Sequence, residues 1–114
     1  MSSINKAMLL GNLGDTPELT STKSGMKVVN FSLATSYGKD DKTEWHRIVA
    51  FDKQAEIAAK YLVKGSQVHV EGRIQYRTFE GNDGNKKYFT EIVAERVTLL
   101  NNKKNTDSGD AFSD

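Results

Sequence analysis

The sequence predicts a mainly β domain, a five-stranded barrel with one short helix, followed by a flexible acidic tail. Two observations support this fold class. Nearly every apolar stretch alternates with polar residues at a period of two, which is typical of strands, and a single segment has the spacing of an amphipathic helix. At 114 residues the chain has the length of one domain. We therefore assign residues 1–100 to one folded domain and residues 101–114 to a linker and tail.

Five segments have the composition of strands, and their approximate bounds are residues 4–13, 27–37, 43–52, 67–79 and 87–100. On the second of them, Val29, Phe31 and Leu33 alternate with mostly polar residues, so one face of this strand is predicted to be buried. The fourth and fifth strands are joined by residues 80–86, which are rich in Gly and Asn and therefore predict a hairpin loop.

The predicted helix covers residues 53–64, between the third and fourth strands. Its apolar positions i, i+3, i+4 and i+7 are Ala55, Ala58, Ala59 and Leu62. Asp52 is the candidate N-cap and Gly65 the candidate C-terminal stop. Five strands with one helix between the third and fourth is the element order of the OB-fold, a partly open barrel whose strand face and loops often hold oligonucleotides.

Composition excludes several kinds of site. The chain has no cysteine, which excludes disulfides, thiolate zinc sites and a cysteine nucleophile. No segment has the roughly 20 apolar residues of a membrane span, and the first residues lack the pattern of an export signal, so we expect a cytoplasmic protein. Residues 1–104 hold 16 Lys and Arg against 12 Asp and Glu, whereas the last ten residues carry three Asp and no basic residue. A mildly basic body of this kind can meet phosphate.

Three aromatic residues share strand faces with arginines. Trp45 and Phe51 lie on the same face of the third strand as Arg47. The odd positions of the fourth strand hold the rest of the set, Arg73, Arg77 and Phe79. Aromatic rings interleaved with cations are typical of surfaces for single-stranded nucleic acid, because unpaired bases stack on the rings while the cations contact phosphates. The alternative for Trp45 and Phe51 is a place in the core, where most aromatic residues of small β proteins lie.

Further candidates for such a surface lie on other elements. Tyr37, at the end of the second strand, is a candidate fourth stacking position. Lys6, Lys53 and Lys64 are candidates for lining the path of a nucleic-acid backbone. Each cation alone is weak support, since Lys and Arg are solvated surface residues by default.

A resemblance to a known family rests on residues 11–18 (GNLGDTPE), 31–36 (FSLATS), 43–51 (TEWHRIVAF), 60–68 (KYLVKGSQV) and 70–72 (VEG). In this order, over about residues 1–100, the segments resemble the bacterial single-stranded DNA-binding protein family, including its phage and plasmid members. The resemblance implies an OB-fold, a homotetramer, and non-catalytic binding of single-stranded DNA during replication, recombination and repair. It implies no cofactor, no metal and no catalytic residue.

The resemblance also implies roles for individual residues. The family's base-stacking positions fall on Trp45, Phe51 and Phe79. Its basic positions fall on Arg47, Lys53 and Lys64, and Lys6 follows the matching asparagine of the first strand. His46 matches a histidine that lies at the subunit interface in the family.

The chain departs from the family in the hairpin after Tyr37, which is shorter than in many members, and in the tail, which lacks a long Gly/Gln/Pro-rich linker and a terminal Pro-Phe. The tail residues that we expect to dock replication, recombination and repair proteins are Asp107, Asp110, Phe112 and Asp114. The alternatives are a tail that only aids solubility and a tail that occupies the basic DNA path when DNA is absent.

Other functions compete with single-strand binding. One is a primosome-type OB adaptor that acts mainly through protein contacts. A second is an enzyme on an OB scaffold, such as a nuclease, for which the sequence offers no acidic cluster and no glycine-rich phosphate loop. Two histidines, His46 and His69, with Glu44 or Glu71, are thin support for a metal or acid–base site without a third ligand or a nucleophile motif. A cold-shock-like RNA binder would carry a Gly-Phe-Gly-Phe-type signature, which is absent.

Overall fold

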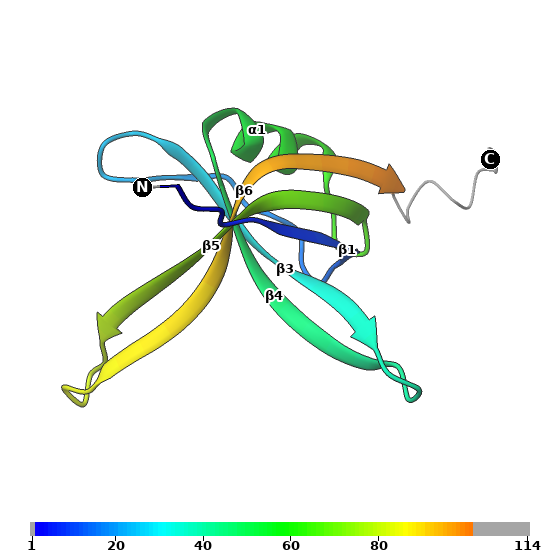
Figure 1. The fold of residues 1–114 in the computed structure, drawn as a ribbon. Helices are drawn as coiled ribbons and strands as arrows, with labels where there is room; N and C mark the ends of the chain where they lie inside the picture. Colours follow the sequence, from blue (N-terminus) through cyan, green and yellow to red (C-terminus); the bar gives the residue numbers. More distant parts are fainter. Residues whose placement is uncertain (1, 102–114) are drawn as a thin grey trace.

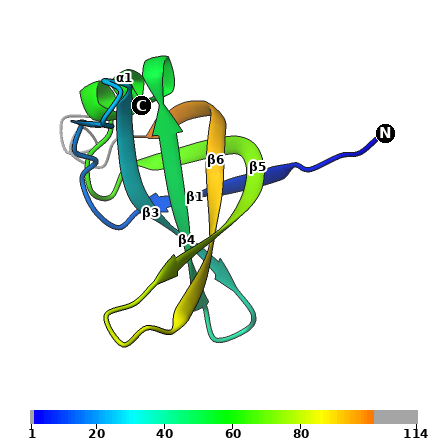
Figure 2. The same cartoon turned by 90° about the vertical axis from the view of Figure 1, so that its left-hand side faces the viewer.

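The computed structural model describes residues 2–101, which form a closed β-barrel with one helix packed over one end and two long hairpins extending from the other (Figures 1 and 2). In chain order the elements are β1 (Ala7–Leu13), β2 (Thr20–Ser21), β3 (Lys27–Tyr37), β4 (Lys42–Phe51), α1 (Asp52–Tyr61), β5 (Gln67–Glu80) and β6 (Lys86–Asn101). Five long strands with one helix between the third and fourth of them confirm the OB-fold, and the two-residue strand β2 is an addition to the predicted set.

The strands close into a ring. The sheet runs β1-β5-β6-β4-β3-β2, and a further pairing of β1 with β3 joins its ends through Asn12–Ala34 and Leu13–Leu33. At this closure a Cβ at Gly11 would lie 2.1 Å from the carbonyl oxygen of Ala34, so only glycine permits the two backbones to approach. All pairings are antiparallel except that of β4 with β6, which covers only Ile48–Ile92 and Val49–Val93.

The core lies inside this ring and follows the predicted alternation. Val29, Phe31 and Leu33 of β3 are at most 2% exposed, and Ile48 of β4 is fully buried. Helix α1 covers one end of the core with Ala55 and Ala58, and Leu62, the residue directly after the helix, packs beside them; all three are at most 2% exposed. The apolar face that the spacing of residues 53–64 predicted is therefore the face that packs.

Beyond the short β4–β6 pairing, two hairpins leave the barrel and diverge (Figures 1 and 2). We call them the β3–β4 arm (residues 32–47) and the β5–β6 arm (residues 75–91). Each arm is paired to its tip, at Tyr37–Lys42 in the first and at Glu80–Lys86 in the second. The arms therefore project two-stranded surfaces on either side of an open space.

The ends of the helix differ from the prediction. Phe51, with an extended backbone, occupies the N-cap, no side chain caps the helix, and Asp52 is the first helical residue with a φ of 53°. Asp52 is therefore not the N-cap; its carboxylate lies in the first turn, where the helix dipole favours negative charge. The helix ends at Tyr61 with Leu62 as its C-cap, so Gly65 lies in the following turn, where its φ of 92° suits glycine.

The first strand also begins later than predicted, at Ala7, and Ile4 is 93% exposed. Before β1, the side-chain amide of Asn5 forms the two hydrogen bonds to β5 that a strand backbone would form. Its Nδ2 donates to the carbonyl of Ile74 at 2.8 Å, and its Oδ1 accepts from the Ile74 N–H at 2.9 Å. Among residues 2–101, no helix is long and apolar enough to cross a membrane.

Candidate nucleic-acid interface

One continuous outward face runs over β4, β6 and β5 between the two arms, and we call it the groove face. Val49 pairs with Val93 across the β4–β6 contact, and Val93 pairs with Arg73 of β5, so side chains that alternate with these three share one side of the sheet. The members of the groove face are Trp45, Arg47, Val49, Phe51, Arg73, Gln75, Arg77, Phe79, Phe89, Glu91 and Val93. The fold thus brings together two sets of aromatic and basic residues that lie about 30 positions apart in the sequence.

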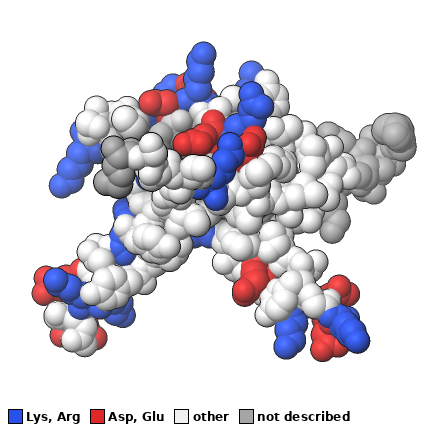
Figure 3. All heavy atoms as spheres, in the orientation of Figure 1, with Lys and Arg blue, Asp and Glu red and all other residues white. Residues whose placement is uncertain are grey.

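Two open hollows lie along this face. The larger, about 360 Å³, is lined in part by Trp45 and Arg47, and the other, about 250 Å³, by Phe51, Arg77 and Glu91 among others. In Figure 3 the arms stand apart below the body, with charged side chains gathered at their tips.

Trp45 is the most exposed aromatic residue of the groove face. The residue is 62% exposed, which excludes the core alternative. A Cβ at Gly14 would lie 2.5 Å from Cζ3 of Trp45, so the indole lies directly against the backbone of the loop after β1. Gly14 itself is held by a hydrogen bond from its N–H to the carbonyl of Ser32, at 2.9 Å. The ring therefore has one supported side and one open side.

A second aromatic group lies on the β5–β6 arm. Phe79, 49% exposed, meets the half-buried Phe89 edge to face with the ring centres 5.6 Å apart. Two guanidinium groups lie over the Phe89 ring: that of Arg77 is 4.7 Å from its centre and that of Arg47 is 5.9 Å away. Arg47 comes from β4, so Phe89 is the point at which side chains of both arms meet.

Beneath these side chains lies a buried carboxylate. Glu91 is 2% exposed, and its Oε1 lies 3.0 Å from Nε of Arg77 and accepts a hydrogen bond of 2.9 Å from the amide of Gln75. Oε1 of Gln75 in turn accepts from Nη1 of Arg73 at 3.1 Å. The other oxygen, Oε2 of Glu91, has no hydrogen-bond partner among the described residues. One connected set of polar groups thus fixes the floor of the groove face.

Phe51, the last residue of β4, is half-buried and faces the smaller hollow. Phe51 is therefore intermediate between the two predictions for it, a stacking position and a place in the core, because it is only partly buried. Its position next to α1 places it at the helix end of the groove face.

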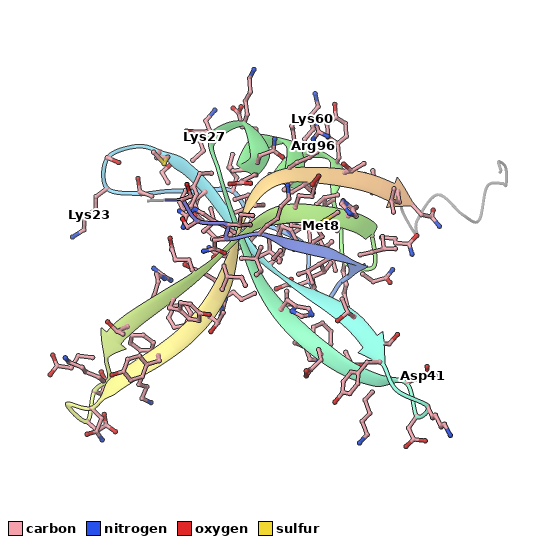
Figure 4. The ribbon with its side chains drawn as sticks, viewed as in Figure 1. Met8, Lys23, Lys27, Asp41, Lys60 and Arg96 are labelled. Atoms are coloured by element: carbon pink, nitrogen blue, oxygen red, sulfur yellow. The ribbon has the colours of Figure 1, made fainter. Side chains whose placement is uncertain are left out.

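Four predicted site residues lie away from the groove face. Tyr37 is 53% exposed, but it does not face the groove. Ala34 pairs with Trp45 and shares its side of the arm, and Tyr37, three residues further along β3, lies on the opposite side. Lys6 precedes β1, and its Nζ lies 3.5 Å from Glu71. Lys53 is in the first turn of α1 and Lys64 in the loop after it. Figure 4 shows the helix end of the molecule, where Lys27, Lys60 and Arg96 are labelled, far from the arm tips.

The histidines do not converge on a site. His46 lies on the opposite side of β4 from Trp45, is half-buried, and has Nε2 2.8 Å from Oγ1 of Thr35. His69 lies on β5, where it pairs with Leu10. Residues 2–101 contain no group of three or more His, Asp or Glu placed to hold a metal ion. The tail residues Asp107, Asp110, Phe112 and Asp114 lie outside the described residues.

Sequence reasoning missed Phe89, Gln75 and Glu91. A signal for Phe89 is present in the sequence: a hairpin centred on residue 83 pairs position 79 with 87 and therefore Arg77 with Phe89, which is the register observed. Gln75 and Glu91 follow by alternation once that register is known. The burial of Glu91 does not follow, because it depends on the contact between β4 and β6.

Comparisons with known proteins agree with this geometry. Residues 4–100 match the family described as Single-strand binding protein family, and the chain belongs to that family. It is 50% identical to "Single-stranded DNA-binding protein 1" of Chlorobaculum tepidum, over 97% of this chain and 72% of that protein. It is 47% identical to "Single-stranded DNA-binding protein" of Xylella fastidiosa, over 85% of this chain, and it spans 63% of that relative's length.

A solved structure resembles the fold throughout. The "Plasmodium falciparum SSB complex with ssDNA" matches 89% of this chain and 98% of its own chain, with a TM-score of 0.80 and 35% sequence identity. The barrel and its arms are thus the architecture of a protein that has been seen with single-stranded DNA.

Proposed function

We propose that this chain binds single-stranded DNA on the groove face, without sequence preference and without catalysis. The observation that carries the proposal is the exposure of Trp45 and Phe79 on one face with Arg47 and Arg77. Unpaired bases offer flat faces to such rings, whereas the bases of a duplex are stacked on each other and unavailable. The named activities of its relatives support the same ligand.

Titration of a labelled oligo(dT) tests the stacking positions. Trp45→Ala, Phe51→Ala and Phe79→Ala are each expected to weaken binding by about 1–3 kcal/mol. Tyr76→Ala is the matched control, because Tyr76 is 74% exposed but lies between Gln75 and Arg77 on β5, and so on the opposite side of the strand from the groove face. Unchanged affinity in a folded Phe79→Ala variant, or an equal loss in Tyr76→Ala, contradicts the assignment.

The cations set the salt dependence of the same titration. Each phosphate neutralised contributes a slope of about −0.7 to a plot of log affinity against log salt on single strands. We expect a clear negative slope, to which Arg47 and Arg73 contribute. Lys6, Lys53 and Lys64 lie on other elements, and we propose that they meet DNA that continues beyond the groove face. Salt-independent binding contradicts the electrostatic part of the proposal.

We further propose that the chain forms a symmetric homo-oligomer, most simply a tetramer, through surfaces that include β1 and His46. Within the part of the chain that the structure describes, residues 7–11 pair with β5 on one edge only, since the β1–β3 pairing begins at Asn12. Met8 and Leu10 on this strand are 60% and 52% exposed (Figure 4 labels Met8). An open edge with apolar side chains favours pairing with a second copy. Light scattering that shows only monomer at micromolar concentration contradicts this.

We also propose that the tail recruits the proteins of replication, recombination and repair with which the chain acts. Phe112 among three Asp has the chemistry to enter an apolar pocket with a basic rim on a partner protein. Pull-downs from lysate with the full chain, a chain lacking residues 105–114 and Phe112→Ala test it. Identical partner sets from all three contradict docking by the tail.

A further inference from the structure

Two arginines on the same face of β5 have partners of opposite kind. Arg73 donates from Nη1 to the neutral amide of Gln75, at 3.1 Å. Arg77 instead pairs through Nε with the carboxylate of Glu91, at 3.0 Å. The two side chains are four residues apart on one strand, so the difference lies in what is beneath them and not in where they point.

The Glu91 carboxylate compensates the charge of Arg77. Its side chain is 3% exposed, whereas that of Arg77 is 55% exposed. A buried carboxylate is screened little by solvent, and a charge in this position is retained only with a cation beside it. Among the described residues Glu91 forms one ion pair, with Nε of Arg77, so Arg77 is that cation. A phosphate that approaches Arg77 therefore meets a pair with no net charge, while one that approaches Arg73 meets a full positive charge.

With its charge compensated, Arg77 can still contact DNA through the flat surface of its guanidinium group. Its guanidinium lies over the Phe89 ring, 4.7 Å from the centre, and Phe79 packs against the edge of the same ring. The ion pair of Nε with Glu91 and the contact of the guanidinium carbon with the Phe89 ring hold the group in place, while more than half of the side chain remains open to solvent. Guanidinium planes stack on unpaired bases much as aromatic rings do.

We propose that Arg77 binds single-stranded DNA by stacking its guanidinium plane on a base instead of neutralising a phosphate, and that Glu91 is the positioning residue that assigns it this role. The inference rests on the proposed function and specifies one of its contacts. It also makes Phe89 the support under a platform that consists of Phe79 and Arg77.

The test compares the two arginines on two ligands, an oligo(dT) and an abasic oligonucleotide of the same length, over a series of salt concentrations. Arg77→Lys keeps the charge beside Glu91 but removes the plane, so binding to oligo(dT) is expected to weaken about tenfold with an unchanged salt slope. Binding of this variant to the abasic strand is expected to match wild type. Arg73→Gln is expected to weaken binding to both ligands and to reduce the slope by about 0.7, with Arg73→Lys restoring the slope.

The double variant Arg77→Gln/Glu91→Gln removes both charges and so leaves no buried carboxylate unpaired. Its salt slope on oligo(dT) is expected to equal that of wild type, and thermal melting shows that it is folded. An Arg77→Lys variant that binds oligo(dT) like wild type, or a double variant whose slope falls by about 0.7, overturns the inference. Should the double variant not fold, the two ligands with Arg77→Lys decide alone. Failure of wild type to bind oligo(dT) is a different outcome and overturns the proposed function itself.

Discussion

The two arms present aromatic surface in different ways. On the β3–β4 arm, Trp45 is a single ring, 62% exposed and supported by the backbone at Gly14. On the β5–β6 arm, Phe79 is one member of a set in which Phe89, Arg77 and buried Glu91 contact one another. The first surface consists of one side chain on a scaffold, and the second of side chains that position each other.

This difference has energetic consequences. A ring that rests on backbone contributes to binding on its own, so its removal affects little else. A ring within a connected set is already ordered before DNA arrives, so less conformational entropy is lost on binding, but each member depends on the others. We therefore expect a substitution at Trp45 to act independently and substitutions at Phe79, Phe89 and Arg77 to be coupled.

The largest expected effect concerns the base of the β5–β6 arm. A Cβ at Gly72 would lie 2.1 Å from the carbonyl oxygen of Val93, and backbone cannot move aside as a side chain does. Gly72→Ala is therefore expected to lower the free energy of unfolding by about 3 kcal/mol. Gly38→Ala, in the tip of the β3–β4 arm, places its Cβ within 4 Å of no atom of residues 2–101 and is strained only by its φ of 79°, at a cost of about 1 kcal/mol. Urea denaturation followed by Trp45 fluorescence measures both, and equal costs contradict the close approach at Gly72.

Next in size is the coupling between rings. Phe79→Ala and Phe89→Ala are expected to weaken DNA binding non-additively, with a coupling of about 0.5–1.5 kcal/mol, because the two rings are in direct contact. Phe79→Ala and Trp45→Ala, on different arms, are expected to add within about 0.5 kcal/mol. Fluorescence anisotropy of a labelled oligo(dT) gives both double-mutant cycles. Coupling of similar size in the two cycles removes the distinction between the arms.

A smaller effect is expected at Gly14. Its added Cβ would lie 2.5 Å from Trp45 Cζ3 and 2.9 Å from Ser32 Oγ, both of which are side-chain atoms that can shift. Gly14→Ala is expected to weaken DNA binding by about 1 kcal/mol, the lower end of a stacking contribution, and to shift the emission maximum of Trp45. In a Trp45→Ala background the same substitution is expected to cost no further affinity. A further loss there assigns another role to Gly14.

The smallest effect lies outside both arms. Glu56 on α1 accepts a hydrogen bond from Lys27, which with the positive charge of Lys27 lowers the pKa of Glu56 below its ordinary value of 4.5. The lowered pKa means that the pair stabilises the fold above pH 4.5 and that this contribution is lost as the pH falls through the folded-state pKa. Both side chains are about half exposed, so the contribution is small and screened by salt. Melting temperatures of wild type and Glu56→Gln are expected to differ slightly near neutral pH and to converge once the pH falls below the folded-state pKa of Glu56, and at high salt. A difference that persists in acid assigns it to something other than the Lys27 ion pair.

Much of the architecture follows from local patterns. Alternation of apolar and polar residues predicts the long strands, and apolar residues at positions i, i+3, i+4 and i+7 predict α1. Each pattern reflects which side of one element is buried. The same alternation places Trp45 with Arg47 and Phe79 with Arg77, and the element order predicts the OB-fold. The cap at Asp52 is wrong for a local reason, since the chain enters the helix from the extended residue Phe51 without a side-chain hydrogen bond.

The connected set on the β5–β6 arm depends on the tertiary structure. The buried state of Glu91 and the position of Phe89 under both Arg47 and Arg77 require β4 to lie beside β6, strands that are separated in the chain by a helix and another strand. No local pattern carries this information, because alternation specifies that Glu91 faces outward but not which strand lies next to it. Outward-facing residues are usually solvated, and here the neighbouring strand converts one of them into a buried charge that determines what the arginine above it can bind.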